Sequence, residues 1–293
     1  MHIAVFGNVE SWYVADLARA ARARRHRLTR VEFRQLVAQT GTSGPLLKVS
    51  ETVLTECEAI VVRTMPPGSL EQVVFRMDAL ARLERAGTLV LNSPKAIEYA
   101  VDKYHTTARL AHAGLPVPET IVCEDAERAL EAFDTLGGDV VVKPLFGSEG
   151  RGILRVSDPD LAFRTFRTLE RTGSVIYLQR FIEHEGFDIR ALVLDGRILG
   201  GMKRSNQSDF RTNVSRQARG EPWMLTDDES RLALEAAQAV EGRFAGVDLL
   251  YRRDGTCYVL EVNAVPGWKA FNRANRTDVA AQVIGLLERE TEA

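Results

Sequence analysis

The stretch at residues 246–267 constrains this chain most, because it predicts a β-hairpin with acidic and amide side chains on one face. Asp254-Gly255 is a strong turn signal, since both positions tolerate a positive φ and the flanking runs are rich in Val, Leu and Tyr. Counting outward from an Arg253/Thr256 pair places Asp248 directly across from Glu261. Side-chain alternation then places Asn263 on the same face as Glu261.

Two carboxylates that face each other across a sheet repel, so this pair makes best sense with a cation between its members. Oxygen ligands without a neighbouring Cys or His suit a hard ion such as Mg²⁺, which takes further oxygens from substrate phosphates. The predicted metal ligands are Asp248, Glu261 and Asn263, with Mn²⁺ as an alternative ion. The competing interpretation is an exposed strand whose acids are solvated, but the apolar Leu250 and Val259 on the predicted face weigh against it.

Composition places the chain among ordinary globular proteins. Its 293 residues give room for about two domains or one multi-lobed unit. A formal net charge of -2 and an isoelectric point near 6.3 give no electrostatic argument for nucleic acid or an anionic membrane as a partner. No apolar run has the length to span a bilayer, and the three cysteines are too widely spaced to predict a disulfide framework or a thiolate site. We therefore expect a cytoplasmic protein.

The first 93 residues alternate short apolar runs with helical patterns, which predicts a parallel α/β unit. Strands are expected at residues 2–7, 28–33, 59–62 and 89–91, and helices at 11–25 and 70–86. Arg63 follows the third strand, at the edge where ligands bind in open α/β folds. It is a candidate to face a substrate, and a solvated loop arginine is an equal alternative. Asn92-Ser93-Pro94 marks the end of the unit.

A lysine, Lys143, lies inside the apolar run 139–145 and is followed at once by a glycine-rich loop. An unpaired ammonium among apolar residues is costly, so this lysine predicts an anionic partner. The loop glycines let backbone N–H groups converge on phosphate oxygens, and the lysine precedes them, unlike in a Walker A motif. Alone, the loop could equally be a flexible turn. Together with the acidic hairpin it favours a nucleoside triphosphate.

A second hairpin is predicted around Asp195-Gly196. Its two-residue turn places Asp188 across from Lys203, with Arg190 on the same face as Asp188. Further arginines follow before a helix expected at residues 227–244, in a polar connection of weak periodicity. They are Arg204, Arg211 and Arg216, with Asn213 among them. So many arginines outside a helix suggest binding of phosphate or carboxylate, and the alternative for each is a solvated surface charge.

Several short motifs occur in order along the chain: Lys103, VVKP with Lys143, GSEGRG at 147–152, QRFI at 179–182, DIR at 188–190, DFRTN at 209–213, Asp248 and EVN at 261–263. This set resembles the ATP-grasp superfamily, and within it the RimK-type amino-acid ligases, which include α-L-glutamate ligases and LysX-like enzymes. The resemblance covers nearly the whole chain. It implies an α/β ATP-grasp fold with a Rossmann-like N-terminal domain (1–93), a central lobe with the glycine-rich loop (94–175) and a C-terminal lobe with the metal site (176–293), the two lobes clamping ATP.

The resemblance also implies roles for these residues. The lysines and the glycine-rich loop would contact phosphates, the QRFI segment adenine, Asp188 the ribose side, and the DFRTN segment the γ-phosphate region. The predicted ATP-contacting residues are Lys103, Lys143, Gly147, Ser148, Gly150, Gly152, Gln179, Arg180, Phe181, Ile182, Asp188, Lys203, Arg211 and Asn213. Arg190, Arg204 and Arg211 are the candidates for stabilising negative charge during the reaction.

The expected function is that of an ATP-dependent carboxylate–amine ligase that works through an acyl phosphate. The arginines exceed what ATP requires, so L-glutamate, with its extra carboxylate, is the leading amine substrate. A small metabolite or cofactor is expected as acceptor; Trp268 is a candidate to stack on a flat ring, and a packed core tryptophan is the alternative. The other interpretations are a LysX-like acceptor, a protein C-terminus, or a non-catalytic nucleotide-binding protein. The oligomeric state stays open, and a homo-oligomer is one alternative.

Overall fold

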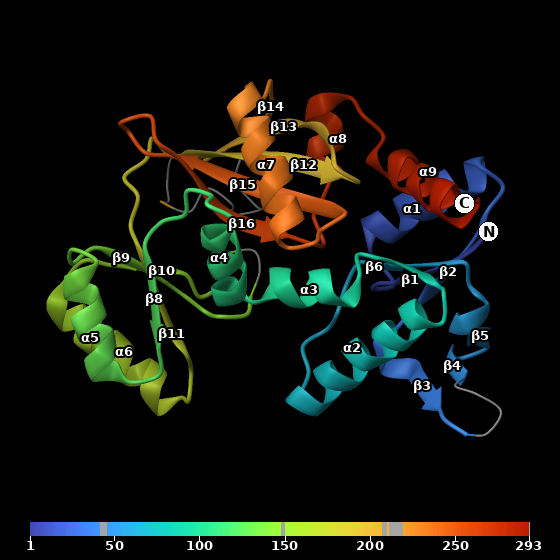
Figure 1. The fold of residues 1–293 in the computed structure, drawn as a ribbon, viewed down its shortest axis with the longest axis horizontal. Coiled ribbons are helices and arrows are strands. Elements are labelled where there is room, and N and C mark those ends of the chain that lie inside the picture. Colours follow the sequence, from blue (N-terminus) through green and yellow to red (C-terminus); the bar gives the residue numbers. More distant parts are fainter. Residues whose placement is uncertain (42–45, 148–149, 207–209, 211–218, 293) are drawn as a thin grey trace.

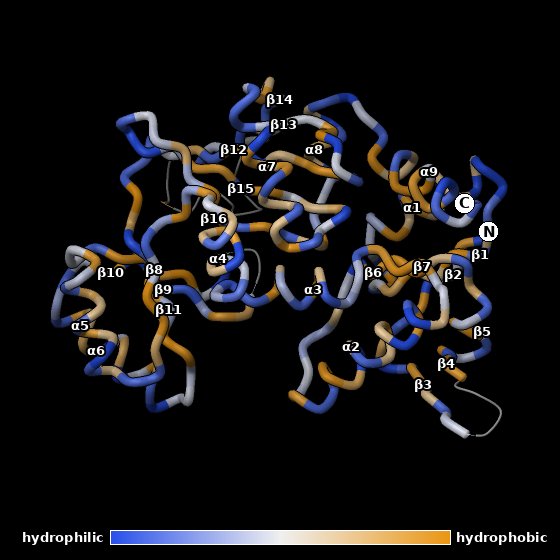
Figure 2. The backbone as a smooth tube through the Cα atoms, viewed as in Figure 1, coloured by the Kyte–Doolittle hydropathy of each residue, from blue (hydrophilic) through white to orange (hydrophobic). Residues whose placement is uncertain are grey.

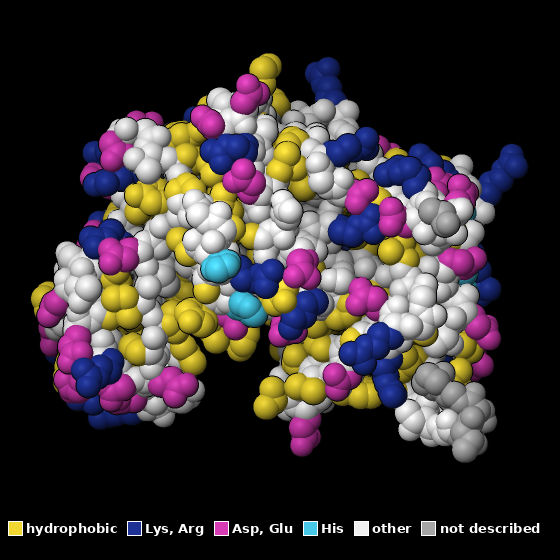
Figure 3. All heavy atoms as spheres, viewed as in Figure 1, with side chains coloured by type: hydrophobic (Ala, Val, Ile, Leu, Met, Phe, Trp, Pro, Cys, Tyr) yellow, Lys and Arg dark blue, Asp and Glu magenta, His cyan; other side chains and the backbone are white. Residues whose placement is uncertain are grey.

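The chain forms three lobes, each built on its own sheet, in the computed structural model (Figure 1). The structure describes residues 1–41, 46–147, 150–206, 210 and 219–292. Within these residues, no helix is both long and apolar enough to cross a membrane. Charged side chains of both signs are spread over all three lobes on the face shown in Figure 3, where a hollow separates the central from the N-terminal lobe.

The N-terminal lobe contains the predicted parallel sheet. Its strand order is β2 (Arg27–Val31), β1 (His2–Phe6), β6 (Ala59–Val62) and β7 (Leu89–Leu91). Helices α1 (Trp12–Ala23) and α2 (Leu70–Arg85) connect these strands, and β6 and β7 are hydrophobic along their length (Figure 2). The sequence did not predict a small antiparallel sheet and two short 3₁₀ turns in this lobe. They are β3 (Leu36–Gln39), β4 (Leu46–Val49) and β5 (Thr52–Val53), with η1 (Phe33–Gln35) and η2 (Leu54–Glu56).

Two short helices, α3 (Pro94–Val101) and α4 (Lys103–His112), lead out of the N-terminal lobe. The helical pattern of residues 95–113 predicts one continuous helix here. It is broken at Asp102, whose side chain caps α4 by accepting a hydrogen bond from the His105 N–H group. This break places Lys103 at the start of a helix.

The central lobe is an antiparallel sheet covered on one face by two helices. The strand order is β10 (Leu154–Val156), β9 (Val140–Lys143), β11 (Ile176–Arg180) and β8 (Thr120–Cys123), and the helices are α5 (Ala126–Thr135) and α6 (Pro159–Arg171). These elements share an apolar cluster of their own. Because β11 belongs to this sheet, we propose that the boundary with the C-terminal lobe lies after Arg180 rather than after residue 175.

The C-terminal lobe contains both predicted hairpins in one antiparallel sheet. Its order is β14 (Arg219–Trp223), β13 (Arg197–Ser205), β12 (Phe187–Leu194), β15 (Phe244–Tyr251) and β16 (Cys257–Asn263). Helix α7 (Asp227–Ala239) covers one face of this sheet and is shorter than predicted. Helices α8 (Lys269–Asn275) and α9 (Val279–Glu292) follow, and α9 lies against α1 (Figure 1).

The other face of this sheet is divided between two neighbours. At one end, Leu192 and Phe244 belong to an apolar cluster that includes residues of β1, α1 and α9. At the other end, Asp248 and Leu250 line a pocket against the central lobe. Gly246 lies between the two ends, because alternate residues of β15 share a face. The N-terminal and C-terminal lobes therefore share one core, and the pocket begins where that core stops.

Candidate active site

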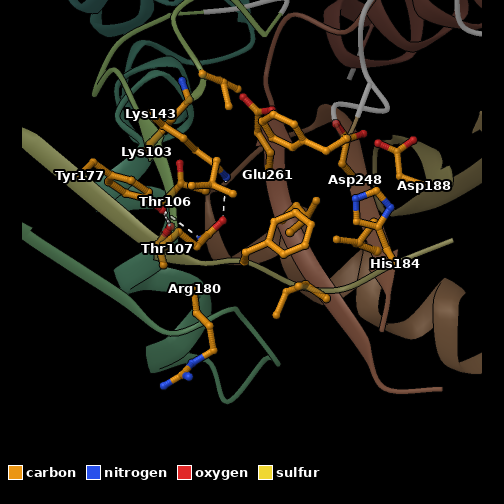
Figure 4. Close-up of a pocket in the computed structure, with 18 of the residues that line it drawn as sticks. Lys103, Thr106, Thr107, Lys143, Tyr177, Arg180, His184, Asp188, Asp248 and Glu261 are labelled. Atoms are coloured by element: carbon orange, nitrogen blue, oxygen red, sulfur yellow. Dashed lines mark hydrogen bonds between the residues drawn. The ribbon is translucent and has the colours of Figure 1, made fainter. Parts of the chain in front are cut away.

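A pocket between the central lobe and the C-terminal sheet brings together many of the predicted residues (Figure 4). Those that line it are Lys103, Lys143, Gln179, Arg180, Phe181, Ile182, Asp188, Asp248 and Glu261. The lysines come from α4 and β9, whereas the carboxylates come from the C-terminal sheet. Positive and negative groups thus face each other across the cleft.

The glycine-rich loop lies beside this pocket. Gly147 accepts a hydrogen bond through its carbonyl oxygen from the Lys103 ammonium, at 2.8 Å. Gly150 and Gly152 have φ values of 70° and 73°, in the left-handed region that favours glycine. Four predicted site residues, Ser148, Arg211, Asn213 and Arg216, lie outside the described residues.

A buried polar network holds Lys143. Its ammonium donates to the Gln179 side-chain oxygen at 2.7 Å, and the Gln179 amide nitrogen donates to the Thr120 hydroxyl at 3.0 Å and the Tyr177 hydroxyl at 3.2 Å. Thr120 donates in turn to the Pro118 carbonyl, which fixes the direction of the bonds. The Gln179 side chain therefore positions Lys143 and is not free to contact a nucleotide base. Within residues 179–182, such a contact would have to come from the backbone and from the apolar side chains.

The ammonium of Lys143 is also poised electrostatically. Burial, the largest cause, lowers the pKa of Lys143 to about 8, while the negative charge of Glu261 opposes that shift. An anion arriving in the pocket would therefore favour the protonated lysine.

Four charged residues form a connected ion-pair network across three strands. Arg190 donates to both oxygens of Asp248, at 2.5 and 2.6 Å, and Arg204 donates to both oxygens of Asp188, at 2.7 and 2.5 Å. Arg204 also lies 2.9 Å from Asp248. Burial alone would raise the pKa of Asp248, but the two arginines lower it below its ordinary value. Asp248 is therefore held ionised, with its charge shared.

The predicted pairing of Asp188 with Lys203 is wrong by one residue. A β-bulge next to Leu192 shifts the hairpin, so Asp188 faces Arg204 instead of Lys203. The Lys203 ammonium lies 4.0 Å from the centre of the Phe187 ring and 5.7 Å from that of Trp223. Lys203 does not line the pocket, so the predicted ATP contact has no support from its position.

In the second hairpin the predicted pairing of Asp248 with Glu261 is correct, but the register near the turn is not. Asp248 does face Glu261, but the strands near the turn pair Tyr251 with Cys257, one residue out of the predicted register. A bulge between Asp248 and Leu249 restores the offset. In consequence Val259 lies in the core beneath α7, and Leu260 lines the pocket in its place.

The carboxylates of this hairpin differ in their availability to a metal ion. No described residue forms a hydrogen bond or ion pair with the side-chain carboxylate of Glu261, whereas both oxygens of Asp248 are engaged by arginines. The Asn263 side-chain oxygen accepts from the Val265 N–H group at 2.8 Å. Among the described residues no cluster of three or more Asp, Glu, His or Cys side chains could hold an ion by itself. Such a donor set fits Mg²⁺ that takes most of its ligands from a nucleotide and water.

Other pocket residues were not singled out from the sequence. Thr106, Thr107, Tyr177, His184 and Phe210 also line the pocket. Tyr177 could have been found, because it lies two residues before Gln179 on the same strand and so shares its face. The ring nitrogen Nδ1 of His184 accepts from the Gly186 N–H group at 3.1 Å, and burial lowers the pKa of His184. No pattern in the sequence marked His184 for the site.

At the junction with the N-terminal lobe, one alternative for each of two side chains is wrong. Trp268 is fully buried, donates to the Asp16 carboxylate at 2.9 Å and packs against Tyr13, so it cannot stack on a substrate ring. Arg63 is 8% exposed and donates to the Pro266 carbonyl at 2.9 Å. The alternative of a solvated loop arginine is therefore wrong.

Comparisons with known proteins agree with this geometry. The model of the RimK-like ATP-grasp domain matches residues 100–287, and that of the RimK PreATP-grasp domain matches residues 1–97. The chain is similar in fold to the solved structure of the ATP-grasp ligase PsnB complexed with minimal precursor, Mg and ADP. The TM-score is 0.77 at 23% identity, covering 99% of this chain and 97% of that one. The predicted ATP-grasp fold is thereby confirmed.

Relatives of known name are similar over most of the chain. It is 38% identical over 226 residues to the tetrahydromethanopterin:alpha-L-glutamate ligase of Methanosarcina acetivorans, covering 73% of this chain and 69% of that protein. It is 33% identical over 211 residues to the probable alpha-L-glutamate ligase of Haemophilus influenzae, covering 71% and 70%. ATP-grasp ligases use ATP together with Mg²⁺. The chain belongs to the RimK-like ATP-grasp family and is an ATP-dependent, ADP-forming carboxylate–amine ligase.

Proposed function

We propose that this ligase joins the amino group of L-glutamate to a carboxylate of a small metabolite or cofactor. The observation that carries this proposal is the similarity, over about 70% of the chain, to relatives named as α-L-glutamate ligases in Methanosarcina and in Haemophilus. Arginines beside the pocket, Arg190 and Arg204, support a substrate of negative charge.

In this proposal the two lysines hold the phosphates of ATP. Lys103 already donates to the glycine-rich loop, and Lys143 is directed into the pocket by Gln179. Phe181 and Ile182 line the part of the pocket beyond Gln179 and would cover the base. Asp188, which lies near the start of β12 and is engaged by Arg204, lines the pocket and would meet the ribose.

Glu261 and Asp248 would hold Mg²⁺, together with Asn263, which lies two residues after Glu261 on β16. When bound, Mg²⁺ neutralises charge on the phosphate oxygens, and Mn²⁺ would substitute because it also prefers oxygen ligands. Glu261 is the carboxylate with no other partner in the described part of the chain. Asp248 keeps its negative charge because Arg190 and Arg204 stabilise the ionised form.

The reaction would proceed in two transfers. The acceptor carboxylate attacks the γ-phosphorus, the bond to ADP breaks, and an acyl phosphate forms. The amine of L-glutamate then attacks the acyl carbon, an amide bond forms as the bond between that carbon and the phosphate oxygen breaks, and the leaving inorganic phosphate takes the electron pair and the proton that the amine loses. Arg190 uses Nε and Nη2 on Asp248, which leaves its Nη1 to stabilise the oxyanion. Arg204 and Arg211 remain proposed for the same role.

The test is ADP release by the full chain with Mg-ATP, each amino acid in turn, and a panel of carboxylates that includes tetrahydromethanopterin and a glutamyl peptide. L-Glutamate is expected to give the highest kcat/KM, and mass analysis should show a product heavier by one glutamyl residue. A higher kcat/KM for a neutral or basic amino acid would overturn the glutamate assignment. A second assay incubates the enzyme with cell extract, ATP and labelled glutamate. Label that appears only in protein would overturn the proposed small-molecule acceptor. Light scattering on the same preparation decides whether the ligase is a homo-oligomer.

A further inference from the structure

A buried arginine at the junction of the N-terminal and C-terminal lobes has no acidic partner among the residues that the structure describes. Arg63 follows β6, and its Nη2 donates to the Pro266 carbonyl, but its buried Nε has no acceptor among the described residues. No described carboxylate lies within ion-pair distance of the guanidinium. The guanidinium lies over two rings instead, with centres 5.0 Å away for Tyr13 and 4.5 Å away for Trp268.

This environment differs from that of the arginines in the pocket network. Arg190 and Arg204 are each bound to carboxylates through two nitrogens. A buried cation without an acid is costly, and stacking on aromatic rings compensates for only part of that cost. The cost shows as a pKa of Arg63 lowered to about 10 by burial. An anion bound beside Arg63 would remove this imbalance.

The position of Arg63 relative to the pocket indicates what kind of anion that is. Its partner Pro266 touches Gly246, since a Cβ placed on Gly246 would lie 3.1 Å from the Pro266 Cβ and 3.3 Å from the Arg190 Cδ. Gly246 precedes Asp248 by two residues on β15, about 7 Å along a strand. Arg63 thus lies toward the end of β15 that packs on the N-terminal lobe, whereas the pocket lies toward the other end, from Asp248 onward.

We propose that Arg63 binds a carboxylate of a substrate where the N-terminal lobe meets the C-terminal sheet, near Asp248. The inference rests on the proposed function, which supplies two sources for this chemistry, the amino-acid substrate and the acceptor. Tight packing prepares the arginine for this role. A Cβ on Gly267 would lie 2.6 Å from the Tyr13 hydroxyl, so the backbone that follows Pro266 packs closely against one of the two rings beside the guanidinium.

The decisive variant is Arg63→Met, which keeps a long apolar stem against the two rings and removes the charge. If Arg63 binds a carboxylate, the KM of one substrate should rise on the order of ten- to a hundredfold, while the KM of ATP changes less than about twofold. The melting temperature should stay the same or rise, because an unpaired buried charge is removed. Arg63→Lys should restore part of the lost affinity.

A matched control is Arg109→Met. Arg109 also lies over a ring, 3.8 Å from the centre of Tyr99, and donates to a carbonyl, that of Ala239 at 2.5 Å. Unlike Arg63, it has an acidic partner, Glu241 at 3.2 Å. Arg109→Met should leave the KM of both substrates unchanged.

The assay varies the two substrates separately, using the pair with the highest turnover in the wild-type screen. If only the KM of the amino acid rises in Arg63→Met, Arg63 binds the carboxylate of the amino acid. If only the KM of the acceptor rises, Arg63 binds the carboxylate of the acceptor. Unchanged KM values with a lower melting temperature would show that Arg63 only fastens the lobes, and the proposal would be wrong. A wild-type enzyme that prefers another amino acid to L-glutamate would overturn the proposed function alone, because the Arg63 comparison is made with whichever substrates are turned over.

Discussion

The two junctions between lobes differ in the kinds of side chains and contacts that hold them together. The N-terminal and C-terminal lobes share an apolar cluster, and Asn92 fastens them with hydrogen bonds to Phe244 and Ala264 of 2.6 to 2.8 Å. The central sheet, in contrast, keeps a separate apolar cluster and meets the C-terminal sheet around a pocket lined by charged and apolar side chains. Junctions without a large shared apolar core permit relative motion more readily than junctions with one. We therefore expect the chemistry to lie between a fixed half and a half that can close on the nucleotide.

The largest expected effect comes from Glu261→Gln, on the fixed side of the pocket. The substitution removes the carboxylate that has no protein partner in the described structure, so kcat should fall about a hundredfold or more, with the melting temperature unchanged. Steady-state ADP release as a function of Mg²⁺ concentration measures this. Glu235→Gln, which changes an exposed acid on α7, is the control and should keep full activity. Normal turnover and normal Mg²⁺ dependence in Glu261→Gln would contradict the role given to this residue.

The fixed junction itself is tested by Asn92→Ala. Asn92 is 2% exposed, and its loss leaves the Phe244 N–H group and two carbonyls without partners, so the free energy of unfolding should fall by about 2 to 4 kcal/mol. Chemical denaturation measures the change. Arg109→Met at the other junction should lower the free energy of unfolding by less than about 1 kcal/mol, because Arg109 and Glu241 are partly exposed. An equal loss in both variants would remove the contrast between the junctions.

A smaller effect is expected from Gln179→Met on the central side of the pocket. The variant keeps the volume but removes the acceptor that directs Lys143, so the KM of ATP should rise about tenfold with little change in kcat. Binding of ATP by calorimetry provides an independent measurement. If only stability changes and the KM stays the same, Gln179 is a packing residue.

The smallest predicted effect is on pH dependence. The pKa of Lys143 is about 8, lowered by burial, so the free enzyme loses this positive charge as the pH rises through that value. The KM of ATP should therefore rise about fourfold between about pH 7 and about pH 8.5. Gln179→Glu places a carboxylate beside the ammonium, raises the Lys143 pKa and should move this rise to higher pH. A flat profile for both enzymes would disprove the assignment.

Comparison of the two hairpins shows how far the sequence predicts the site. Each turn was located correctly from its Asp-Gly pair, and each hairpin contains a bulge that the residue pattern does not mark. In β12 and β13 the bulge gives Asp188 the partner Arg204 instead of Lys203. In β15 and β16 it offsets an error of one residue at the turn, so Asp248 still faces Glu261. Local turn chemistry is encoded in short segments, whereas a bulge depends on packing against neighbouring strands.

The other errors of prediction arose where a residue's environment depends on contacts with residues far away in the sequence. The parallel sheet of the N-terminal lobe was predictable because the alternation of apolar runs is local. The environments of Trp268 and Arg63 were not, since both depend on lobes that are about 200 residues apart in the chain coming together. The partnering of Asp248 with two arginines was missed for the same reason, because Arg190 comes from the other hairpin.

Helix α9 has a consequence for the order in which the protein can fold during its synthesis. The helix covers the apolar face of α1, and Glu288 binds both Arg24 and His26. A ribosome makes the first 93 residues early, yet their core remains open on one side until residues 279–292 have been made. Domains usually fold as they emerge. Here the N-terminal lobe is completed by a helix that is made after the other two sheets, so the nascent chain carries an uncovered apolar surface until that helix appears.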